Sequence, residues 1–280
     1  MTFDKDIWRN SIDWISAKTL PRWPCPYCKE GKLILDSNSL ITKETKNYSA
    51  VNNSSSDQNK EPNLLGFLAN IAITWNDILS WKAGRFTAFL MCDKCKEVVS
   101  FNGTARLPVQ REKNYAISIG VCLRPEYFSP ALPIIKICED LPSEIANELS
   151  ASFSLFFLNS SSSGNKVRSS VELILDNLNI SRFKIGENGE VINNKSGYPI
   201  ENSLHTRIIE FSKKHDHLGD ILLAIKILGN EASHSNNLSK EDLIEAYGVI
   251  DYLIDELYVR PKKYKKALLS SSGIKDKYSK

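Results

Sequence analysis

The spacing of the apolar residues changes along the chain, from short strand-like runs in the first half to helical periods after Pro142. Apolar runs bounded by turn residues predict short strands in the first half. These strands are predicted at residues 31–35, 85–91, 98–103 and 115–121. Asn102-Gly103 is typical of a hairpin turn and is expected to end the third strand. Ahead of the strands, four large apolar residues recur at helical spacing and predict a helix within residues 1–20.

The second half of the chain predicts a bundle of four to six helices. Helices are expected at residues 143–158, 166–178, 204–214, 218–228 and 239–258. The serine-rich run at 160–165 is expected to separate the first two, and the Gly- and Asn-rich residues 181–200 are expected to be irregular. Ser239 is placed to cap the last helix, and Pro261 is expected to stop it.

Polar and proline-rich stretches indicate how the chain is organised. Residues 36–63 are mostly polar and predict a solvated insertion, whereas residues 64–81 are apolar and predict a helix or connector. Prolines recur between residues 124 and 142 and favour an extended connector. The predicted modules are a β-rich module with the N-terminal helix and insertion at 1–123, the connector at 124–141, a helical bundle at 142–261 and a basic tail at 262–280. The predicted fold class is α+β and mostly α.

Composition is that of an ordinary globular protein of one or two domains. Of its 280 residues 42% are hydrophobic and 25% are charged, and the formal net charge is +3. Residues 262–280 hold seven lysines and one aspartate, so the tail is expected to be mobile or ordered by a partner. The tail is either a contact to phosphates or a solubilising segment. The chain has no run of 18 apolar residues and begins with an acidic, amphipathic segment, so we expect no membrane span and a cytoplasmic protein.

Four cysteines form two Cys-x-x-Cys pairs, Cys25 with Cys28 and Cys92 with Cys95. Two such pairs are the ligand set of a zinc ribbon, in which four thiolates hold one tetrahedral Zn²⁺. The alternatives are coincidental buried cysteines and a redox pair, although neither pair opens a helix in the manner of a thioredoxin. Four protein ligands close the site, which predicts a structural zinc rather than a catalytic one.

Two further groups of residues are candidates for chemistry. Gly229 and Asn230 are typical of a helix end, and His234 follows them as a group that can act as a general base near neutral pH. The alternative is that Gly229-Asn230 turns the chain and His234 ties two helices together. Arg168 and Glu172 stand four residues apart on a predicted helix, either as a surface ion pair or facing a seam between helices.

The order of these features resembles a known family. A zinc ribbon precedes a proline-rich connector ending in Leu141-Pro142, and Arg168, Glu172, Gly229-Asn230 and His234 follow. This resembles the bacterial domain-of-unknown-function family 4145, in the subtype with an N-terminal zinc ribbon, over roughly residues 20–262. That family is similar to the helical nucleotide-binding domains abbreviated HEPN, many of which are metal-independent ribonucleases in toxin, restriction and antiphage systems.

The resemblance implies an HEPN-like bundle that forms a homodimer and places Arg168 and Glu172 near Gly229-Asn230-His234. In active HEPN nucleases an arginine precedes the histidine with four to six residues between. Here Lys226 precedes His234 with seven residues between, and it offers a point charge rather than a planar fork.

Two functions are expected from these features. The first is a nucleic-acid- or partner-binding component of a bacterial defence or restriction system, with RNA, DNA or a protein of the same operon as its partner. The second is a metal-independent ribonuclease in which His234 is the base, Lys226 stabilises phosphate charge and Asn230 orients either of them. Arg168, Glu172 and Gly229 would support that site.

Overall fold

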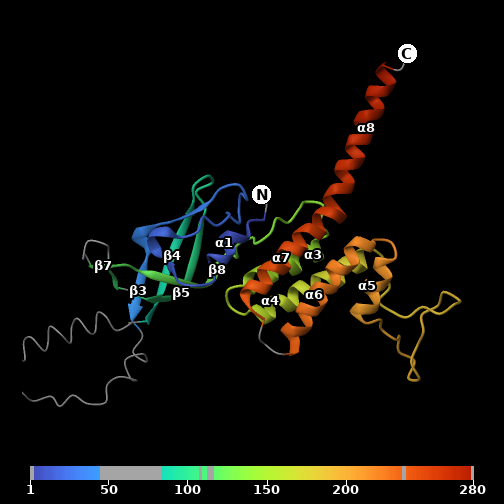
Figure 1. Cartoon of the computed structure of the whole chain (residues 1–280), viewed down its shortest axis with the longest axis horizontal. Helices are drawn as coiled ribbons and strands as arrows, with labels where there is room; N and C mark the ends of the chain where they lie inside the picture. The colour runs from blue at the N-terminus through green and yellow to red at the C-terminus, as the bar shows by residue number, and fades with distance from the viewer. Residues whose placement is uncertain (1–2, 45–82, 107–108, 112–116, 235–237, 279–280) are drawn as a thin grey trace, which may run out of the picture. The chain divides into compact units, whose positions relative to one another are not determined.

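The structure is a computed structural model that describes residues 3–44, 83–106, 109–111, 117–234 and 238–278. The chain forms two compact units (Figure 1). The first comprises Asp6–Leu132, and the second comprises Pro133–Lys280 together with Met1–Lys5. The predicted apolar segment at 64–81 and most of the predicted insertion at 36–63 lie outside the described residues.

The first unit is an antiparallel β half-barrel, which confirms the β structure that the strand-like runs predict. Its main strands are β1 (Ile15–Ser16), β2 (Leu33–Leu35), β3 (Ile41–Glu44), β4 (Ala83–Cys92), β5 (Val98–Arg106) and β8 (Cys122–Ser129). The sheet order is β1-β8-β5-β4-β2, and β3 also pairs with β4. With 10 residues, β4 is long enough to pair with β2 at its Cys92 end and with β3 at its Ala83 end. A separate pair is formed by β6 (Val109–Arg111) and β7 (Ile117–Ile119).

Aromatic side chains fill the inner face of this sheet. Successive residues of β5 alternate between buried and more exposed positions, because side chains of a strand point to opposite faces. Phe101 of β5 stacks on Phe128 of β8 with ring centroids 5.4 Å apart. Trp23 is fully buried against both rings and donates its Nε1–H to Ser11 Oγ at 2.8 Å. Trp23 therefore anchors the segment that leads into the first cysteine pair.

Tertiary pairing changes the predicted boundaries at the start of this unit. The helix predicted within residues 1–20 is limited to α1 (Lys5–Arg9). Ile15, which fits the helical period, instead lies in β1 opposite Leu123 of β8. The prediction is wrong there because a sheet edge supplies hydrogen-bond partners that a local sequence pattern does not record.

The expected hairpin at Asn102-Gly103 is also wrong, because β5 continues to Arg106. Gly103 lies where the register between β5 and β8 shifts, and a Cβ there would come within 2.1 Å of the carbonyl oxygen of Arg124. A glycine allows this close approach of two backbones. The segment predicted as the beginning of an extended connector forms β8, with Pro125 opposite Gly103.

The second unit is a region of six helices. These are α3 (Ser143–Leu155), α4 (Ser160–Asn177), α5 (Leu204–Ser212), α6 (Asp216–His234), α7 (Lys240–Ile254) and α8 (Arg260–Tyr278). Helix α4 packs against α3, α6 and α7, and α6 also packs against α5 and α7. The cap predicted for α7 is confirmed, because Ser239 Oγ accepts the N–H of Asp242 at 3.0 Å.

A buried polar network ties α3, α4 and α7 together. The hydroxyl of Tyr247 lies 2.8 Å from Ser163 Oγ and donates to Ser152 Oγ at 3.0 Å. Ser163 Oγ also donates to the carbonyl oxygen of Ser152 at 2.7 Å. Burial raises the pKa of the Tyr247 phenol well above its usual range. The network therefore holds a neutral phenol inside the bundle.

Helix α4 starts earlier than predicted, at the serine-rich run. Asn159 caps it by accepting the N–H of Ser162 at 2.7 Å. Gly164, the fifth residue of α4, is packed tightly: a Cβ there would come within 2.5 Å of Leu238 Cδ2. Local propensity indicates a break here, but packing against neighbouring segments selects the helix.

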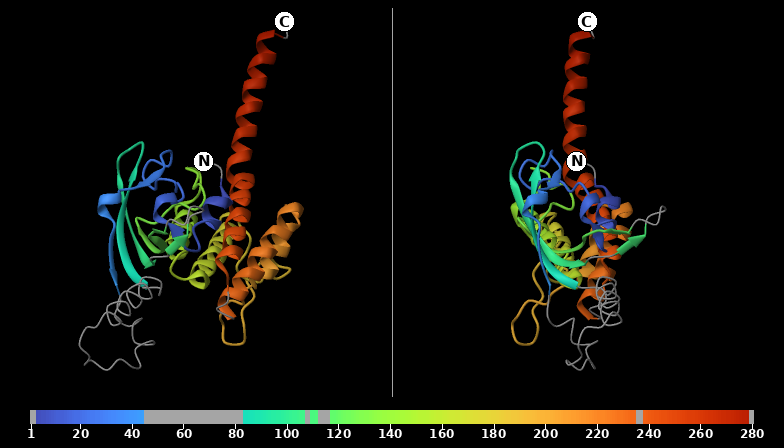
Figure 2. Two further views of the ribbon diagram at one scale, coloured as in Figure 1. Left: turned by 60° about the vertical axis from the view of Figure 1, so that its left-hand side comes forward. Right: turned by 90° about the vertical axis from the view of Figure 1, so that its left-hand side faces the viewer.

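Two other predicted helix ends are absent. Helix α6 continues through Gly229 and Asn230 to His234. Beyond α7, the π-helical segment η4 (Asp255–Val259) leads into α8, so Pro261 does not stop the chain's helical course. Pro261 is the second residue of α8 and has no N–H to donate, and the π-helical bonding of η4 directly before it marks where the regular α-helical pattern changes. The predicted basic tail is therefore helical up to Tyr278, which the sequence pattern did not predict. The two views of Figure 2 show α8 extending away from the other helices of its unit.

The segment between α4 and α5 contains an eight-residue repeat that the sequence prediction missed. The N–H of Lys184 donates to the carbonyl of Ile200, that of Ile200 to Ile192, and that of Ile192 to Lys184, each at 2.9 Å. Because these residues are spaced by eight, the three segments close into a ring with approximate three-fold symmetry. Gly189 and Gly197 have the same spacing and positive φ angles of 81° and 84° in the intervening turns. We call residues 182–202 the three-fold arm.

Candidate functional site

The four cysteine sulfurs meet at the end of the sheet where β2 pairs with β4. Cys25 and Cys28 precede β2, Cys92 ends β4, and Cys95 lies just before β5. All four Sγ atoms lie within 4.8 Å of one another. Cys25 Sγ is 3.6 Å from Cys95 Sγ, and Cys28 Sγ is 3.7 Å from Cys92 Sγ. A tetrahedron with zinc–sulfur bonds of about 2.3 Å has edges of about 3.8 Å, so the spacing fits a metal at the centre.

The two cysteine pairs have the same backbone geometry. Lys29 and Lys96, which directly follow the second cysteine of each pair, have positive φ angles of 60° and 66°. Each donates its N–H to the carbonyl of the first cysteine of its own pair, at 3.0 Å and 3.2 Å. This tight turn directs both sulfurs of a pair to the same side. The prediction that the two cysteine pairs meet at one centre is confirmed, because their four sulfurs form a single cluster.

Backbone N–H groups donate to the sulfurs of Cys28 and Cys92. Gly31 N–H donates to Cys28 Sγ at 3.3 Å, and Cys95 N–H donates to Cys92 Sγ at 3.4 Å. Backbone hydrogen bonds from Glu30 and Gly31 lower the pKa of Cys28 to about 6, whereas burial raises the pKa of Cys25 to about 12. A metal ion would bind all four as thiolates. Because four thiolates leave no open position for water or substrate, the cluster is consistent with a structural metal site, and its donor set favours zinc.

The residues expected to support a helical site come together where α4 packs against α6. A Cβ on Gly229 would come within 2.8 Å of both Cβ and Cδ of Arg168, so the glycine allows the arginine to lie across α6. Arg168 Nη2 is 3.5 Å from Glu172 Oε1, and the two side chains are 33% and 42% exposed. Arg168 Nε is buried and has no hydrogen-bond partner among the described residues. The pair is therefore beside Gly229, as expected, but is partly exposed.

The other three residues occupy one face of α6. Lys226, Asn230 and His234 follow one another at intervals of four in an unbroken helix, and such residues lie on the same side. Lys226 and Asn230 are partly buried. His234 is the last residue of α6, and its side chain lies outside what the structure describes. Whether these residues act together in catalysis stays a prediction.

Sequence reasoning missed one further candidate site. A cavity of about 530 Å³ lies beside α5, with walls from the three-fold arm and from the segment after α4. Its basic residues, Lys184, Arg207 and Lys214, are separated in the sequence by 22 and 6 intervening residues and form no recognisable motif. The eight-residue spacing of the arm was the available signal, and it points to the arm rather than to the cavity.

Comparison with known proteins identifies two families of unknown function. Residues 150–274 match the family model described as a domain of unknown function, DUF4145, and these residues contain most of the helical unit. Residues 13–128 match a second domain of unknown function, DUF8608, which covers the half-barrel with its cysteine cluster. The expected resemblance is thus confirmed for the helical part, whereas the metal-site part matches a separate family. No curated protein and no solved structure matched the chain in these comparisons.

The comparisons assign no activity to either family. Within the part of the chain that the structure describes, no helix is both long and apolar enough to cross a membrane.

Proposed function

We propose that this protein is a nucleic-acid-binding component of a bacterial defence or restriction system, and that α8 contacts the phosphate backbone. The observation that carries this proposal is the charge and exposure of α8. The helix has 19 residues, and residues 260–272 are all exposed. From Arg260 to Tyr278 it contains seven basic residues and a single acidic one. This charge is complementary to a polyanion.

Two of these basic residues are already used within the unit. Lys262 pairs with Asp140, and Arg260 donates Nε to Asp255 Oδ2 at 3.1 Å. Lys263, Lys265 and Lys266 make no ion pair among the described residues, so their charges are available to a ligand. An isolated helix of this length is marginal in water, because most helical stability in proteins comes from packing. Contact with a nucleic acid would supply the missing interactions.

The test is a salt-dependent binding measurement. A variant with Lys263, Lys265 and Lys266 changed to Gln is compared with the wild type, using fluorescently labelled duplex DNA and single-stranded RNA at several salt concentrations. Each lost phosphate contact should lower the slope of log affinity against log salt by about 0.9 on duplex DNA. The magnitude of that slope should therefore be smaller by about 2 to 3 in the triple variant than in the wild type.

A second triple variant provides the matched control. Lys136, Lys195 and Lys213 are exposed lysines of the same unit, and changing them to Gln removes the same charge elsewhere. Equal loss of binding in both variants, or no binding by the wild type at low salt, would show that α8 is not a nucleic-acid contact. In that case a protein partner is the better explanation of α8. The homodimer is part of the proposal and is checked by light scattering.

A ribonuclease is the second candidate, because α6 is continuous and aligns Lys226, Asn230 and His234 on one face. Over eight residues the helix rises about 12 Å, a distance that a long lysine side chain and an extended RNA backbone can span. His234 would take the proton of the ribose 2′-hydroxyl, whose oxygen attacks the phosphorus while the bond to the 5′-oxygen breaks and that oxygen takes up a proton from water. Lys226 would stabilise the charge that develops on the phosphate.

Incubation of structured and unstructured RNA with the purified protein tests this candidate. His234→Ala should abolish cleavage, and Lys226→Ala should weaken it severely. Lys226→Arg should retain or raise activity, because arginine matches phosphate geometry better. His217→Ala is the matched control, since His217 is an exposed histidine in the first turn of the same helix. Cleavage that survives His234→Ala would refute this assignment of the base.

A further inference from the structure

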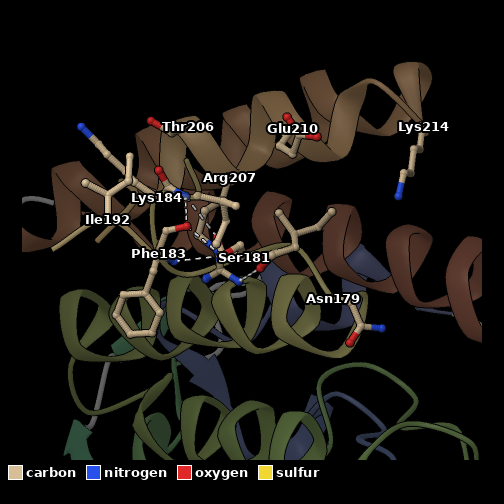
Figure 3. Close-up of a pocket in the computed structure, with 12 residues that line it drawn as sticks. Asn179, Ser181, Phe183, Lys184, Ile192, Thr206, Arg207, Glu210 and Lys214 are labelled. Carbon is tan, nitrogen blue, oxygen red and sulfur yellow. Dashed lines mark hydrogen bonds between the residues drawn. The ribbon is translucent and has the colours of Figure 1, made fainter. Parts of the chain in front are cut away.

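The cavity beside α5 has the size and composition of a small-molecule site. Its volume of about 530 Å³ lies within the range of roughly 300–1,000 Å³ that is typical of ligand pockets. One face of α5 forms a wall, and the three-fold arm and the segment after α4 form the rest (Figure 3). The cavity therefore belongs entirely to the helical unit.

The charged residues that line the cavity leave it electropositive. Lys184, Arg207 and Lys214 contribute three positive charges, and Glu210 is the one acidic residue among the lining residues that the structure describes. Figure 3 shows Arg207 beneath α5, with Lys184 on the Thr206 side and Lys214 at the other end of the helix. Among the lining residues the balance is an excess of two positive charges, and Asp176, which pairs with Arg207, lies outside that lining.

Arg207 is the fixed cation of the cavity. It is only 4% exposed, and its Nη2 donates to Asp176 Oδ1 at 2.6 Å and to the carbonyl of Ile180 at 3.0 Å. Arg182 Nε also donates to Asp176 at 2.8 Å, so one carboxylate serves two guanidinium groups. Arg207 Nε is buried and has no hydrogen-bond partner among the described residues. A buried donor without an acceptor is costly, and an anionic ligand would satisfy it after a small shift.

The wall formed by the three-fold arm is apolar. Ile185 and Ile192 line the cavity and are 48% and 42% exposed in the structure. Covering a large aliphatic side chain with another apolar group lowers the free energy. The position of these isoleucines beside the basic residues therefore indicates a ligand with an apolar part. Ser181, Thr206 and Asn202 add hydrogen-bonding groups to the same lining.

We propose that this cavity binds a phosphate monoester of an organic molecule. A phosphate monoester carries a charge of about −1.5 to −2 near pH 7, which matches the excess of two positive charges better than a single carboxylate does. The phosphate lies beside Arg207, the flexible side chains of Lys184 and Lys214 reach it from the two ends of α5, and the organic group covers the isoleucines of the arm. Such a group is available on a free metabolite or at the phosphorylated end of a nucleic acid, and both sources offer the same chemistry.

Calorimetry with the full-length protein tests the site, with phenyl phosphate as the probe. Phenyl phosphate should bind more tightly than inorganic phosphate, because only the ester has a group that covers Ile185 and Ile192. Lys184→Ala and Lys214→Ala should each weaken phenyl phosphate binding about tenfold, the usual value of one charged hydrogen bond. Lys195→Ala is the matched control, because Lys195 is an exposed lysine of the arm that does not line the cavity, and it should change nothing.

Two further measurements separate the outcomes. If the monoester is the end of a nucleic acid, a 5′-phosphorylated oligonucleotide should bind more tightly than its 5′-hydroxyl counterpart, and phenyl phosphate should compete for the difference. If it is a metabolite, the two oligonucleotides should bind equally while phenyl phosphate still binds. No binding of phenyl phosphate at millimolar concentration overturns the proposal, as does equal binding by wild type and by the double variant Lys184→Ala/Lys214→Ala. Either result is independent of α8, whose lysines lie outside the cavity.

Discussion

Gly31→Ala is expected to weaken metal binding strongly while leaving all four cysteines in place. Gly31 follows the first cysteine pair, and a Cβ at this position would lie 2.3 Å from Cys92 Sγ. Non-bonded heavy atoms pack at about 3.5–4.0 Å, so the overlap is more than 1 Å. The same Cβ would lie 2.9 Å from Lys94 Cβ, so residue 31 cannot relieve the overlap by shifting toward Lys94.

The magnitude follows from the loss of one ligand. To relieve the overlap, Cys92 Sγ must move by about 1 Å, which is nearly half of a zinc–sulfur bond of about 2.3 Å. A structural zinc contributes about 10–16 kcal/mol, or roughly 2.5–4 kcal/mol for each of four ligands. Losing one ligand should therefore weaken zinc binding by about 10²–10³-fold.

Competition with a chromophoric chelator measures this loss. Thiol titration of the denatured variant should still find every cysteine, while the zinc released at low chelator concentration should increase sharply. Gly120→Ala is the matched control, because a Cβ there would meet nothing within 4 Å. If Gly31→Ala retains one zinc with the wild-type resistance to chelator, the close approach of residue 31 to Cys92 Sγ does not limit metal binding, and the reasoning is refuted.

Three other outcomes are expected. Tyr247→Phe should lower the free energy of unfolding by about 1 kcal/mol at pH 7, because the buried hydroxyl bonds to Ser152 and Ser163. Burial raises the pKa of Tyr247, so wild-type stability should be full below the ordinary tyrosine value of about 10 and should decline as the pH rises above it. Denaturant unfolding at pH 7 and pH 11 checks both points, and a variant that declines as steeply as wild type contradicts the second. Glu172→Ala should cost only about 0–1 kcal/mol, since the ion pair with Arg168 is partly exposed; a loss of about 3–5 kcal/mol in the same assay would indicate a buried pair. Chelation of the metal should unfold the half-barrel and leave the circular dichroism of the helices largely unchanged, whereas joint melting of both units would show that they fold as one.

Short-range patterns allowed a good part of this protein to be predicted. The cysteine pairs were recognisable because a metal knuckle is a local turn, and its ligand spacing is set within four residues. Helices α3, α5 and α7 were predicted close to their observed positions because their apolar residues keep a helical period and, in α7, because Ser239 provides a cap. The change from β to helical structure follows from the same periodicities.

Helix ends and the strand nearest the N-terminus depended on tertiary packing. Serine and glycine at the start of α4 indicate a break locally, but the approach of Leu238 requires a glycine at position 164. Gly229 likewise suggests a helix end and instead makes room for Arg168. Ile15 fits a helix and joins β8 because the sheet offers backbone partners there. In each case a long-range contact outweighs a local preference of about 1 kcal/mol or less.

The sequence by itself therefore determined the candidate metal ligands, the two structural classes and the concentration of charge in α8. Only the tertiary structure decided where residues distant in the chain meet. It joined Lys184, Ile192 and Ile200 into a ring, and it placed that ring beside Arg207 and Lys214 to form a cavity. The physical reason is that a cavity is lined by groups that are close in space, and the entropic cost of bringing distant residues together rises only slowly with the length of chain between them.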